Sequence, residues 1–212
     1  MSRISKISSV VTLSTLLLLI SQSIFAQTVK YTKKTGSQVS EVVYNISKKG
    51  NVTNLFIQVG AQKSYHEIDS KYQTVSLRIV DESKKFDVSI TREGQRYHIV
   101  GVTKGKPVDK YENSNGYPWY QNLAYICGKI VKPGSTVRYE CFRPGEFSLE
   151  TMEASIVDCH ELEGVCVRAT PTGVKKKFWH ADYYFSETGR TLTGYKAVEG
   201  GPGTPVTTWT LK

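Results

Sequence analysis

The sequence lacks the short motifs that mark common enzyme classes. It contains no G-x-S-x-G, H-E-x-x-H or S-x-x-K motif and no phosphate-binding G-x-x-x-x-G-K loop. Its four histidines, His66, His98, His160 and His180, form no pair at metal-ligand spacing. The sequence therefore predicts no catalytic residue, no metal ligand and no cofactor, and we expect the protein not to be an enzyme.

The sequence also lacks an apolar run long enough to span a membrane. Its densest apolar segment, residues 16–20, is followed by the polar segment 21–23. The apolar stretch is thus shorter than the roughly 18 residues that a spanning helix requires. Arg3 and Lys6 precede it without any acidic residue, and the small residue Ala26 follows it. This arrangement is typical of a cleavable secretory signal peptide.

We therefore expect residues 1–26 to be a signal peptide and residues 27–212 to form a single β-rich domain. The length of the remaining segment suits one domain, and no shift in composition or long linker divides it. The first cysteine is Cys127, so no cysteine near the cleavage point could accept a lipid. The sequence predicts a soluble protein of the periplasm.

Acidic residues are fewer than basic ones. Removal of Arg3 and Lys6 with the leader leaves 26 basic against 19 acidic residues, a net charge of +7. The basic residues form short groups near turns, which is typical of solvated loop tips. If the surplus has a partner, an anionic lipid headgroup or polysaccharide at the cell envelope is favoured. Nucleic acid is not expected outside the cytoplasm.

Helical signal is sparse, whereas strand signal is frequent. Turn residues recur at short intervals from residue 52 onward, and the runs between them are rich in Val, Ile, Thr and aromatic residues. We expect strands at 52–59, 74–80, 86–90, 96–102, 126–131, 136–142, 154–159, 165–169, 178–185, 191–198 and 206–211. The spacing leaves no room for crossover helices. The predicted fold is mainly β, a curved antiparallel meander resembling a half-barrel, with one or two short helices.

Two segments allow helix as well. Residues 37–48 place Val39, Val42, Val43 and Ile46 at helical spacing, but the same segment also suits a strand. A short helix is expected over 119–124, because this segment has no breaker and follows a proline.

Four cysteines lie in the second half of the chain, which is expected to be exported. Cys127 and Cys141 are symmetric about the turn at residues 132–135, and Cys159 and Cys166 are symmetric about residues 161–164. The two cysteines of each pair would lie opposite each other across a hairpin, so the sequence favours disulfides Cys127–Cys141 and Cys159–Cys166. The spacing does not suit a structural zinc site.

Aromatic residues form two groups. Tyr117, Trp119 and Tyr120 follow a turn rich in Asn and Gly, and Trp179 and Tyr183 lie in a strand with bulky side chains on both faces. Such residues either fill a covered core or meet an apolar ligand. All five are candidate ligand-binding residues. Trp119 is expected either to fill the hydrophobic core or to lie at the mouth of the ligand site, where it would control ligand entry as a gate.

Two sequence segments carry a resemblance to known proteins. Residues 117–123 (YPWYQNL) and 178–185 (FWHADYYF), continuing to residues 200–205 (GPGTP within GGPGTP), resemble an uncharacterised family of exported bacterial β-proteins. The meander over 52–99 is similar to the periplasmic lipoprotein-carrier superfamily. That resemblance implies an incomplete β-barrel closed by helices over an apolar cavity.

These observations lead to three hypotheses on function. The first is a soluble periplasmic protein that binds a lipid-like or lipoprotein acyl ligand on the concave face of its sheet. The second is a non-enzymatic interaction module of the cell envelope with a filled core, acting through its Tyr/Trp loop. The third is an envelope hydrolase.

Overall fold

The computed structural model describes residues 25–159, 161–189, 191–199 and 203–212. The predicted signal peptide lies outside these residues except for residues 25 and 26, which begin the first strand. The first half of the chain forms strands β1 Phe25–Thr35, β2 Gln38–Lys49, β3 Val52–Val59, β4 Gln62–Ile68, β5 Thr74–Asp81, β6 Phe86–Glu93, β7 Arg96–Thr103 and β8 Lys106–Asn113. The second half forms helix α1 Leu123–Ile130 and strands β9 Thr136–Arg143, β10 Ser148–Val157, β11 Val165–Pro171, β12 Ala181–Phe185, β13 Leu192–Ala197 and β14 Thr207–Leu211.

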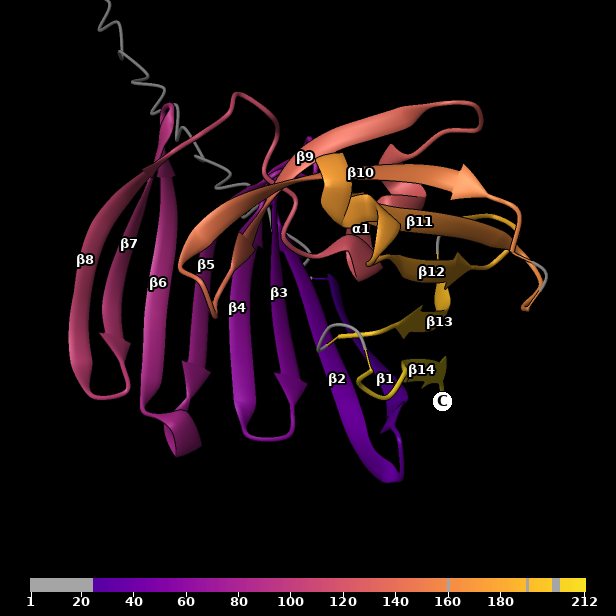
Figure 1. Ribbon diagram of the computed structural model, residues 1–212, viewed down its shortest axis with the longest axis horizontal. Coiled ribbons are helices and arrows are strands. Elements are labelled where there is room, and N and C mark those ends of the chain that lie inside the picture. The colour runs from indigo at the N-terminus through magenta and orange to yellow at the C-terminus, as the bar shows by residue number, and fades with distance from the viewer. Residues whose placement is uncertain (1–24, 160, 190, 200–202) are drawn as a thin grey trace, which may run out of the picture.

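All fourteen described strands belong to one antiparallel sheet, so the predicted mainly β meander is confirmed. The strand order is β8-β7-β6-β5-β4-β3-β2-β1-β14-β13-β12-β11-β10-β9. The first and last strands therefore pair in the middle of the sheet, with Tyr31 opposite Leu211. Strands β8 and β9 form its two edges. The sheet is strongly curved, and its two halves face each other around α1 (Figure 1).

Strand β2 settles the alternative left open for residues 37–48. Val42 and Tyr44 are buried on one face of the strand, and their neighbours on the other face are more exposed. The spacing of two residues matches the pleat of a strand, in which successive side chains point to opposite faces. The strands β1, β4 and β8, in contrast, were not predicted, because their sequences are largely polar.

Short turns set the register of the first half. Gly50 and Gly60 each take the first position of a two-residue turn with a positive φ of 59°. A turn with this conformation matches the twist of a hairpin, and glycine adopts it without steric cost. The residues that follow, Asn51 and Ala61, are exposed at opposite ends of β3.

Helix α1 begins later than the sequence predicts. The Asn122 side chain caps the helix by accepting a hydrogen bond of 2.9 Å from the Tyr125 backbone N–H. Residues 119–121 are not helical, and the predicted strand over 126–131 is wrong because most of it lies in the helix. At Gly128 the helix approaches Gly189 so closely that an added Cβ would lie 1.7 Å from the Gly189 carbonyl oxygen.

Residues 118–121 bridge the two halves of the sheet. The Tyr120 backbone N–H donates to the Glu140 carbonyl on β9 at 3.0 Å, and the Thr74 N–H on β5 donates to the Trp119 carbonyl at 2.8 Å. One segment thus covers the β9 edge and also contacts the start of β5. It holds the curved sheet together where β8 and β9 do not pair.

Two main groups of buried residues fill the space between the halves. One lies around α1 and includes Leu55, Ile126 and Phe185, and the other lies around Trp119 and includes Ile90 and Phe142. Hydrophobic side chains from both halves thus meet inside the curve, and their burial is the main source of stability.

The structure contains one of the two predicted disulfides. Cys159 and Cys166 are joined, which confirms that pair. Cys127 and Cys141 are free thiols, so the second predicted disulfide is wrong. The symmetry argument placed both residues on paired strands, but Cys127 lies on α1 and only Cys141 lies on a strand.

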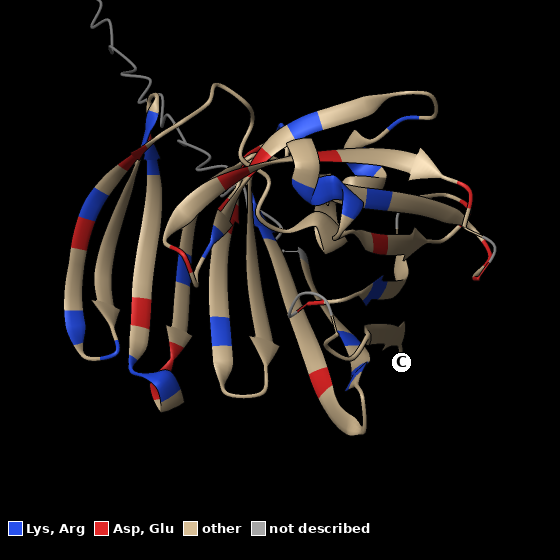
Figure 2. Ribbon diagram, in the orientation of Figure 1, with Lys and Arg blue, Asp and Glu red and all other residues tan. Residues whose placement is uncertain are grey.

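Charged residues are spread over both halves of the sheet (Figure 2). Many of them form cross-strand pairs, such as Arg78 with Asp87 and Arg168 with Asp182, both with two hydrogen bonds. Among the described residues, no helix has the length and apolar character needed to cross a bilayer.

Candidate functional site

The concave side of the sheet contains a cavity of about 600 Å³. Strands β2 to β5 form one wall, and β14 and residues 121 and 122 contribute to the other side. Aliphatic side chains Ile57, Leu77 and Ile79 line this interior cavity together with the aromatic residues Tyr44 and Trp209. Its volume lies within the range of natural small-molecule sites.

Buried polar groups are part of the cavity lining. His66 is 5% exposed, and its Nε2 lies 3.2 Å from the Ser64 hydroxyl. Burial lowers the pKa of His66 to about 3, so the imidazole is neutral at ordinary pH. Its Nδ1 has no hydrogen-bond partner among the described residues, and neither does Nε1 of Trp209.

These two nitrogens are unusual because buried polar atoms in proteins nearly always have a partner. An unpaired buried group costs roughly 1–3 kcal/mol. His66 and Trp209 both belong to the lining of the interior cavity, so a polar group bound there would lie near these two residues.

Ion pairs lie at the rim of the cavity. Lys33 on β1 donates a hydrogen bond of 2.8 Å to Glu199, which lies between β13 and β14. Lys84 pairs with Asp81 at 3.0 Å at the end of β5. The rim therefore offers two ammonium groups, each balanced by a carboxylate, around an interior with an aliphatic wall.

A second hollow, which we call the surface groove, adjoins the cavity. It has a volume of about 650 Å³ and shares Pro144 and Glu199 with the cavity. Met152, Phe178 and Trp179 contribute apolar surface to it. Glu150 lies in the same groove, where it pairs with Arg143 and Lys175. The positive charges of these partners lower the pKa of the Glu150 carboxyl despite its partial burial.

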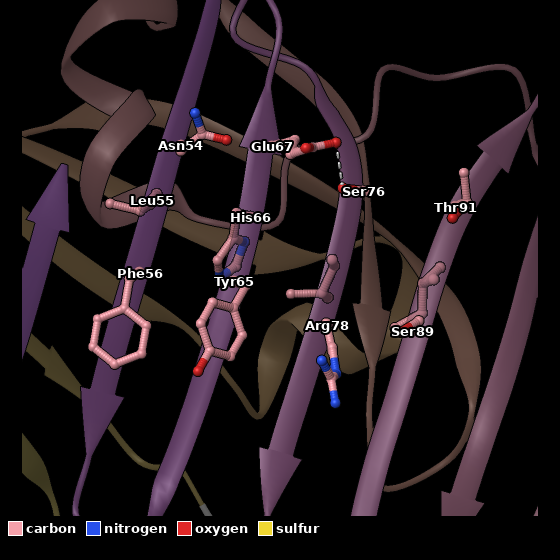
Figure 3. Close-up of a pocket in the computed structure, with 12 residues that line it drawn as sticks. Asn54, Leu55, Phe56, Tyr65, His66, Glu67, Ser76, Arg78, Ser89 and Thr91 are labelled. Carbon is pink, nitrogen blue, oxygen red and sulfur yellow. Dashed lines mark hydrogen bonds between the residues drawn. The ribbon is translucent and has the colours of Figure 1, made fainter. Parts of the chain in front are cut away.

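A third hollow, of about 340 Å³, crosses the outer face of β3 to β6 (Figure 3). Phe56 and Tyr65 lie side by side there, with ring centroids 5.1 Å apart. The Ser76 hydroxyl donates to Glu67 at 2.8 Å. Since this hollow is smaller and these polar groups are already paired, the cavity and surface groove are the better candidate site.

The structure places the first group of predicted site residues in the core. Trp119 is fully buried, its ring meets Tyr97 edge-on at 5.1 Å, and its Nε1–H donates to Gln121. Tyr120 is buried in the group around α1. Tyr117 is half-buried and interacts with Arg138. None of these three lines the interior cavity, the surface groove or the hollow on the outer face of β3 to β6.

The second group lies closer to the candidate site. Trp179 lines the surface groove and donates from Nε1 to the Val198 carbonyl at 2.8 Å. Tyr183 packs beside Tyr195, with ring centroids 5.1 Å apart, and burial raises the pKa of its hydroxyl. Trp179 is thus the predicted residue that the structure brings to the site.

Sequence reasoning did not identify the polar lining of the cavity. His66 was noted as an isolated histidine, and Lys33 and Trp209 were not singled out. A signal was present in Ser64, His66 and Ile68, which alternate with Tyr65 and Glu67 as a strand with one buried face would. The polar character of β4 concealed it.

One group of potential metal ligands occurs in the described part of the chain. Sulfur atoms of Cys159 and Cys166 and a carboxylate oxygen of Asp182 lie within 4.8 Å of one another. The two sulfurs are joined in the disulfide, and Asp182 accepts two hydrogen bonds from Arg168 at 2.7 and 2.9 Å. The two sulfurs thus already form a structural disulfide, and the Asp182 carboxylate already forms an ion pair with Arg168.

Comparison with known proteins supports the fold. No family model matches the sequence, and no curated protein matches it. The structure is similar to the crystal structure of a beta-barrel-like protein of domain of unknown function DUF1849 from Brucella abortus, with a TM-score of 0.58 and 8% sequence identity. The match covers 88% of this chain and 95% of that chain. At this identity the likeness shows the fold alone, so the chain has a β-barrel-like fold, and its resemblance to lipoprotein carriers stays a prediction.

Proposed function

We propose that the protein is a non-enzymatic binding protein of the cell envelope that holds an acyl chain with a polar head in the interior cavity. The observation that carries this proposal is the lining of the cavity, in which unpaired His66 and Trp209 nitrogens lie near an aliphatic wall. A ligand with both apolar and polar parts matches both features.

The apolar part of the ligand would contact Ile57, Leu77 and Ile79. Burial of methylene groups against such a wall contributes roughly 0.8 kcal/mol each, so a chain of several carbons supplies substantial affinity. The polar part would lie toward His66 or toward Lys33 at the rim. Because Lys33 is already paired with Glu199, an anionic head would compete with that carboxylate.

The envelope location rests on the predicted signal peptide. An exported protein meets membranes and lipoproteins directly, and these are sources of acyl chains. The non-enzymatic part of the proposal rests on the lack of a catalytic motif in the sequence.

A mouth-blocking variant tests the proposal. Ala61 is exposed and lines the cavity at the turn between β3 and β4. We expect saturable binding of dansyl-labelled undecanoic acid that persists in high salt, because apolar burial is not screened by ions. Ala61→Trp should weaken this binding by about tenfold or more, since the larger side chain occupies the entrance.

The matched control is Asn51→Trp, which places the same side chain after a glycine in an equivalent turn at the other end of β3. It should bind the probe as the wild type does. Mass spectrometry of the purified protein gives an independent measurement, with a co-purified lipid as the expected result. If the probe does not bind saturably, or if Ala61→Trp leaves binding unchanged, the filled-core interaction module replaces this proposal.

A further inference from the structure

The segment between β11 and β12 exposes large apolar side chains. Val174 is 73% exposed and Phe178 is 69% exposed, the two highest values among the large apolar residues that the structure describes. Exposure of this degree at two positions of one short turn is costly in water unless the surface has a partner. We call residues 173–178 the docking loop.

Positive charges lie directly between these two apolar residues. Lys175, Lys176 and Lys177 are consecutive and exposed, and they form the last turn of the short 3-10 helix Gly173–Lys177. Lys175 pairs with Glu150, and the next two lysines add further positive charge. The loop therefore combines apolar tips with a cluster of cations.

The backbone of the docking loop is held in place at both ends. The Thr172 N–H donates to the Thr151 carbonyl on β10 at 3.0 Å. The N–H groups of Phe178 and Trp179 both donate to the Lys175 carbonyl, at 3.0 and 3.2 Å. The Trp179 ring packs against the core and donates to the Val198 carbonyl. Binding would thus require little ordering of the loop.

We propose that the docking loop binds an anionic lipid membrane, with Val174 and Phe178 inserted among the lipids and the lysines against the headgroups. Apolar side chains flanked by lysines are the chemistry of proteins that lie on a membrane surface. Anionic headgroups attract each nearby lysine, and aromatic rings insert readily at the boundary between headgroups and acyl chains. An acidic protein would satisfy the lysines but would not by itself require the two apolar tips.

The position of the loop connects it to the candidate site. Lys175 and Phe178 line the surface groove, and the surface groove adjoins the interior cavity at Pro144 and Glu199. A membrane bound at the loop would lie beside the entrance of the groove. Membrane binding does not depend on the proposed function, because the loop would bind vesicles whether or not the cavity holds an acyl chain.

Vesicle co-sedimentation tests this proposal. The wild type should bind vesicles of equal parts phosphatidylglycerol and phosphatidylethanolamine, and should bind vesicles of phosphatidylcholine at least about tenfold more weakly. Phe178→Asp should lower binding to the anionic vesicles by about tenfold or more, because it removes the inserted ring and adds a repelled charge. The double variant Lys176→Glu/Lys177→Glu should have a similar effect.

Two control variants separate the loop from general properties of the surface. Lys48→Glu/Lys49→Glu makes the same change in net charge at the exposed end of β2, and Tyr111→Asp replaces another exposed aromatic residue. Both should bind anionic vesicles within about twofold of the wild type. Thermal unfolding of each variant establishes that it is folded, and Phe178→Ser replaces Phe178→Asp if the latter is not.

Several outcomes would overturn the proposal. The first is that the wild type does not bind anionic vesicles. The second is that the Lys176/Lys177 and Lys48/Lys49 double variants lose vesicle binding equally. The third is that Phe178→Asp binds as strongly as the wild type. Binding to an acidic peptide without binding to vesicles would assign the loop to an acidic protein partner instead. The dansyl-fatty-acid titration is measured separately, so a failure of the cavity proposal is distinguishable from a failure of this one.

Discussion

The hydroxyl of Tyr97 on β7 donates a hydrogen bond of 2.5 Å to the fully buried carboxylate of Glu140 on β9. This contact joins the two ends of a sheet whose edge strands do not pair. The Ser114 hydroxyl donates to the same carboxylate at 2.9 Å, and the Asn115 backbone N–H donates to it as well. Glu140 is therefore the point at which β7, β9 and the segment after β8 meet.

Loss of the Tyr97 hydroxyl should destabilise the protein. Tyr97→Phe removes a hydrogen bond to a buried charged group, so we expect a loss of about 1.5–3 kcal/mol in the free energy of unfolding, measured by urea denaturation. The control is Tyr111→Phe, at an exposed position on the neighbouring strand β8, which should change stability by less than about 0.5 kcal/mol. Equal effects of the two changes would contradict the role assigned to the Tyr97–Glu140 bond.

The variant Trp119→Ala tests whether Trp119 stabilises the core or controls entry to the ligand site, that is, acts as a gate. Because the ring is fully buried against Tyr97 and lines none of the described hollows, we expect Trp119→Ala to cost about 3–5 kcal/mol of stability. Denaturant melts and fatty-acid titrations on this variant provide the measurement. An unchanged melt together with lost binding would instead identify Trp119 as a gate.

Acid should destabilise the protein through His66. Burial lowers its pKa from an ordinary 6.5 to about 3, so the unfolded chain binds a proton in a range where the folded protein does not. Stability is therefore lost as the pH falls from 6.5 toward 3, by about 2 kcal/mol at pH 5 from this group. His66→Gln should lose this part of the pH dependence. Denaturation at pH 8, where the imidazole is neutral in both states, supplies the reference; an unchanged slope in the variant would refute the assignment.

Cysteine chemistry should separate the disulfide from the two thiols. Peptide mapping without reductant should yield Cys159 joined to Cys166. Burial raises the pKa of the fully buried Cys127, so its alkylation at pH 8 should require denaturation. Cys141 is partly buried and lines the surface groove, so it should react more readily than Cys127. Reduction of the short disulfide loop should cost about 2–3 kcal/mol. A peptide joining Cys127 to Cys141 would show that the two thiols are not free.

The contact of α1 with the turn at Gly189 should not tolerate a side chain. Gly128→Ala would force the helix away from the Gly189 carbonyl, so we expect a loss of about 1–3 kcal/mol in thermal or chemical unfolding. Gly145→Ala is the matched change at a position where an added Cβ meets open space. If both variants were equally stable, α1 would not be packed as closely as described.

The predictability of each strand depended on its content of strand-forming apolar residues. Residues 52–59 were predicted as a strand to the residue, because the segment is rich in Val, Leu, Ile and Phe and is bounded by the turn residues Gly50 and Gly60. The segment 126–131 was misassigned because isoleucine and valine favour strands, whereas the Asn122 cap and packing inside the curve favour a helix. Similarly, the expected strand over 178–185 begins only at Ala181, because Phe178 and Trp179 follow the short helix of the docking loop.

The candidate site was less predictable than the fold. The cavity combines Lys33, His66 and Trp209, which come from β1, β4 and β14 and are brought together by the pairing of β1 with β14. No local sequence pattern predicts the pairing of two strands that lie so far apart in the chain. Trp179 was identified because bulky residues on both faces of one segment are a local signal, and such signals are visible in sequence.

The pairing of β1 with β14 has a consequence for the order of folding. Each half of the sheet is built from neighbours in sequence, so β1 to β8 and β9 to β14 can each form through short loop closures. The central seam formed by β1 and β14, in contrast, joins residues far apart in sequence, such as Tyr31 and Leu211, and it must wait until β14 has been synthesised. Until then β1 presents an unpaired edge, which can pair wrongly with other chains. A chain exported in an unfolded state would complete this seam last, so its slowest folding step and its greatest risk of aggregation would both lie at β1.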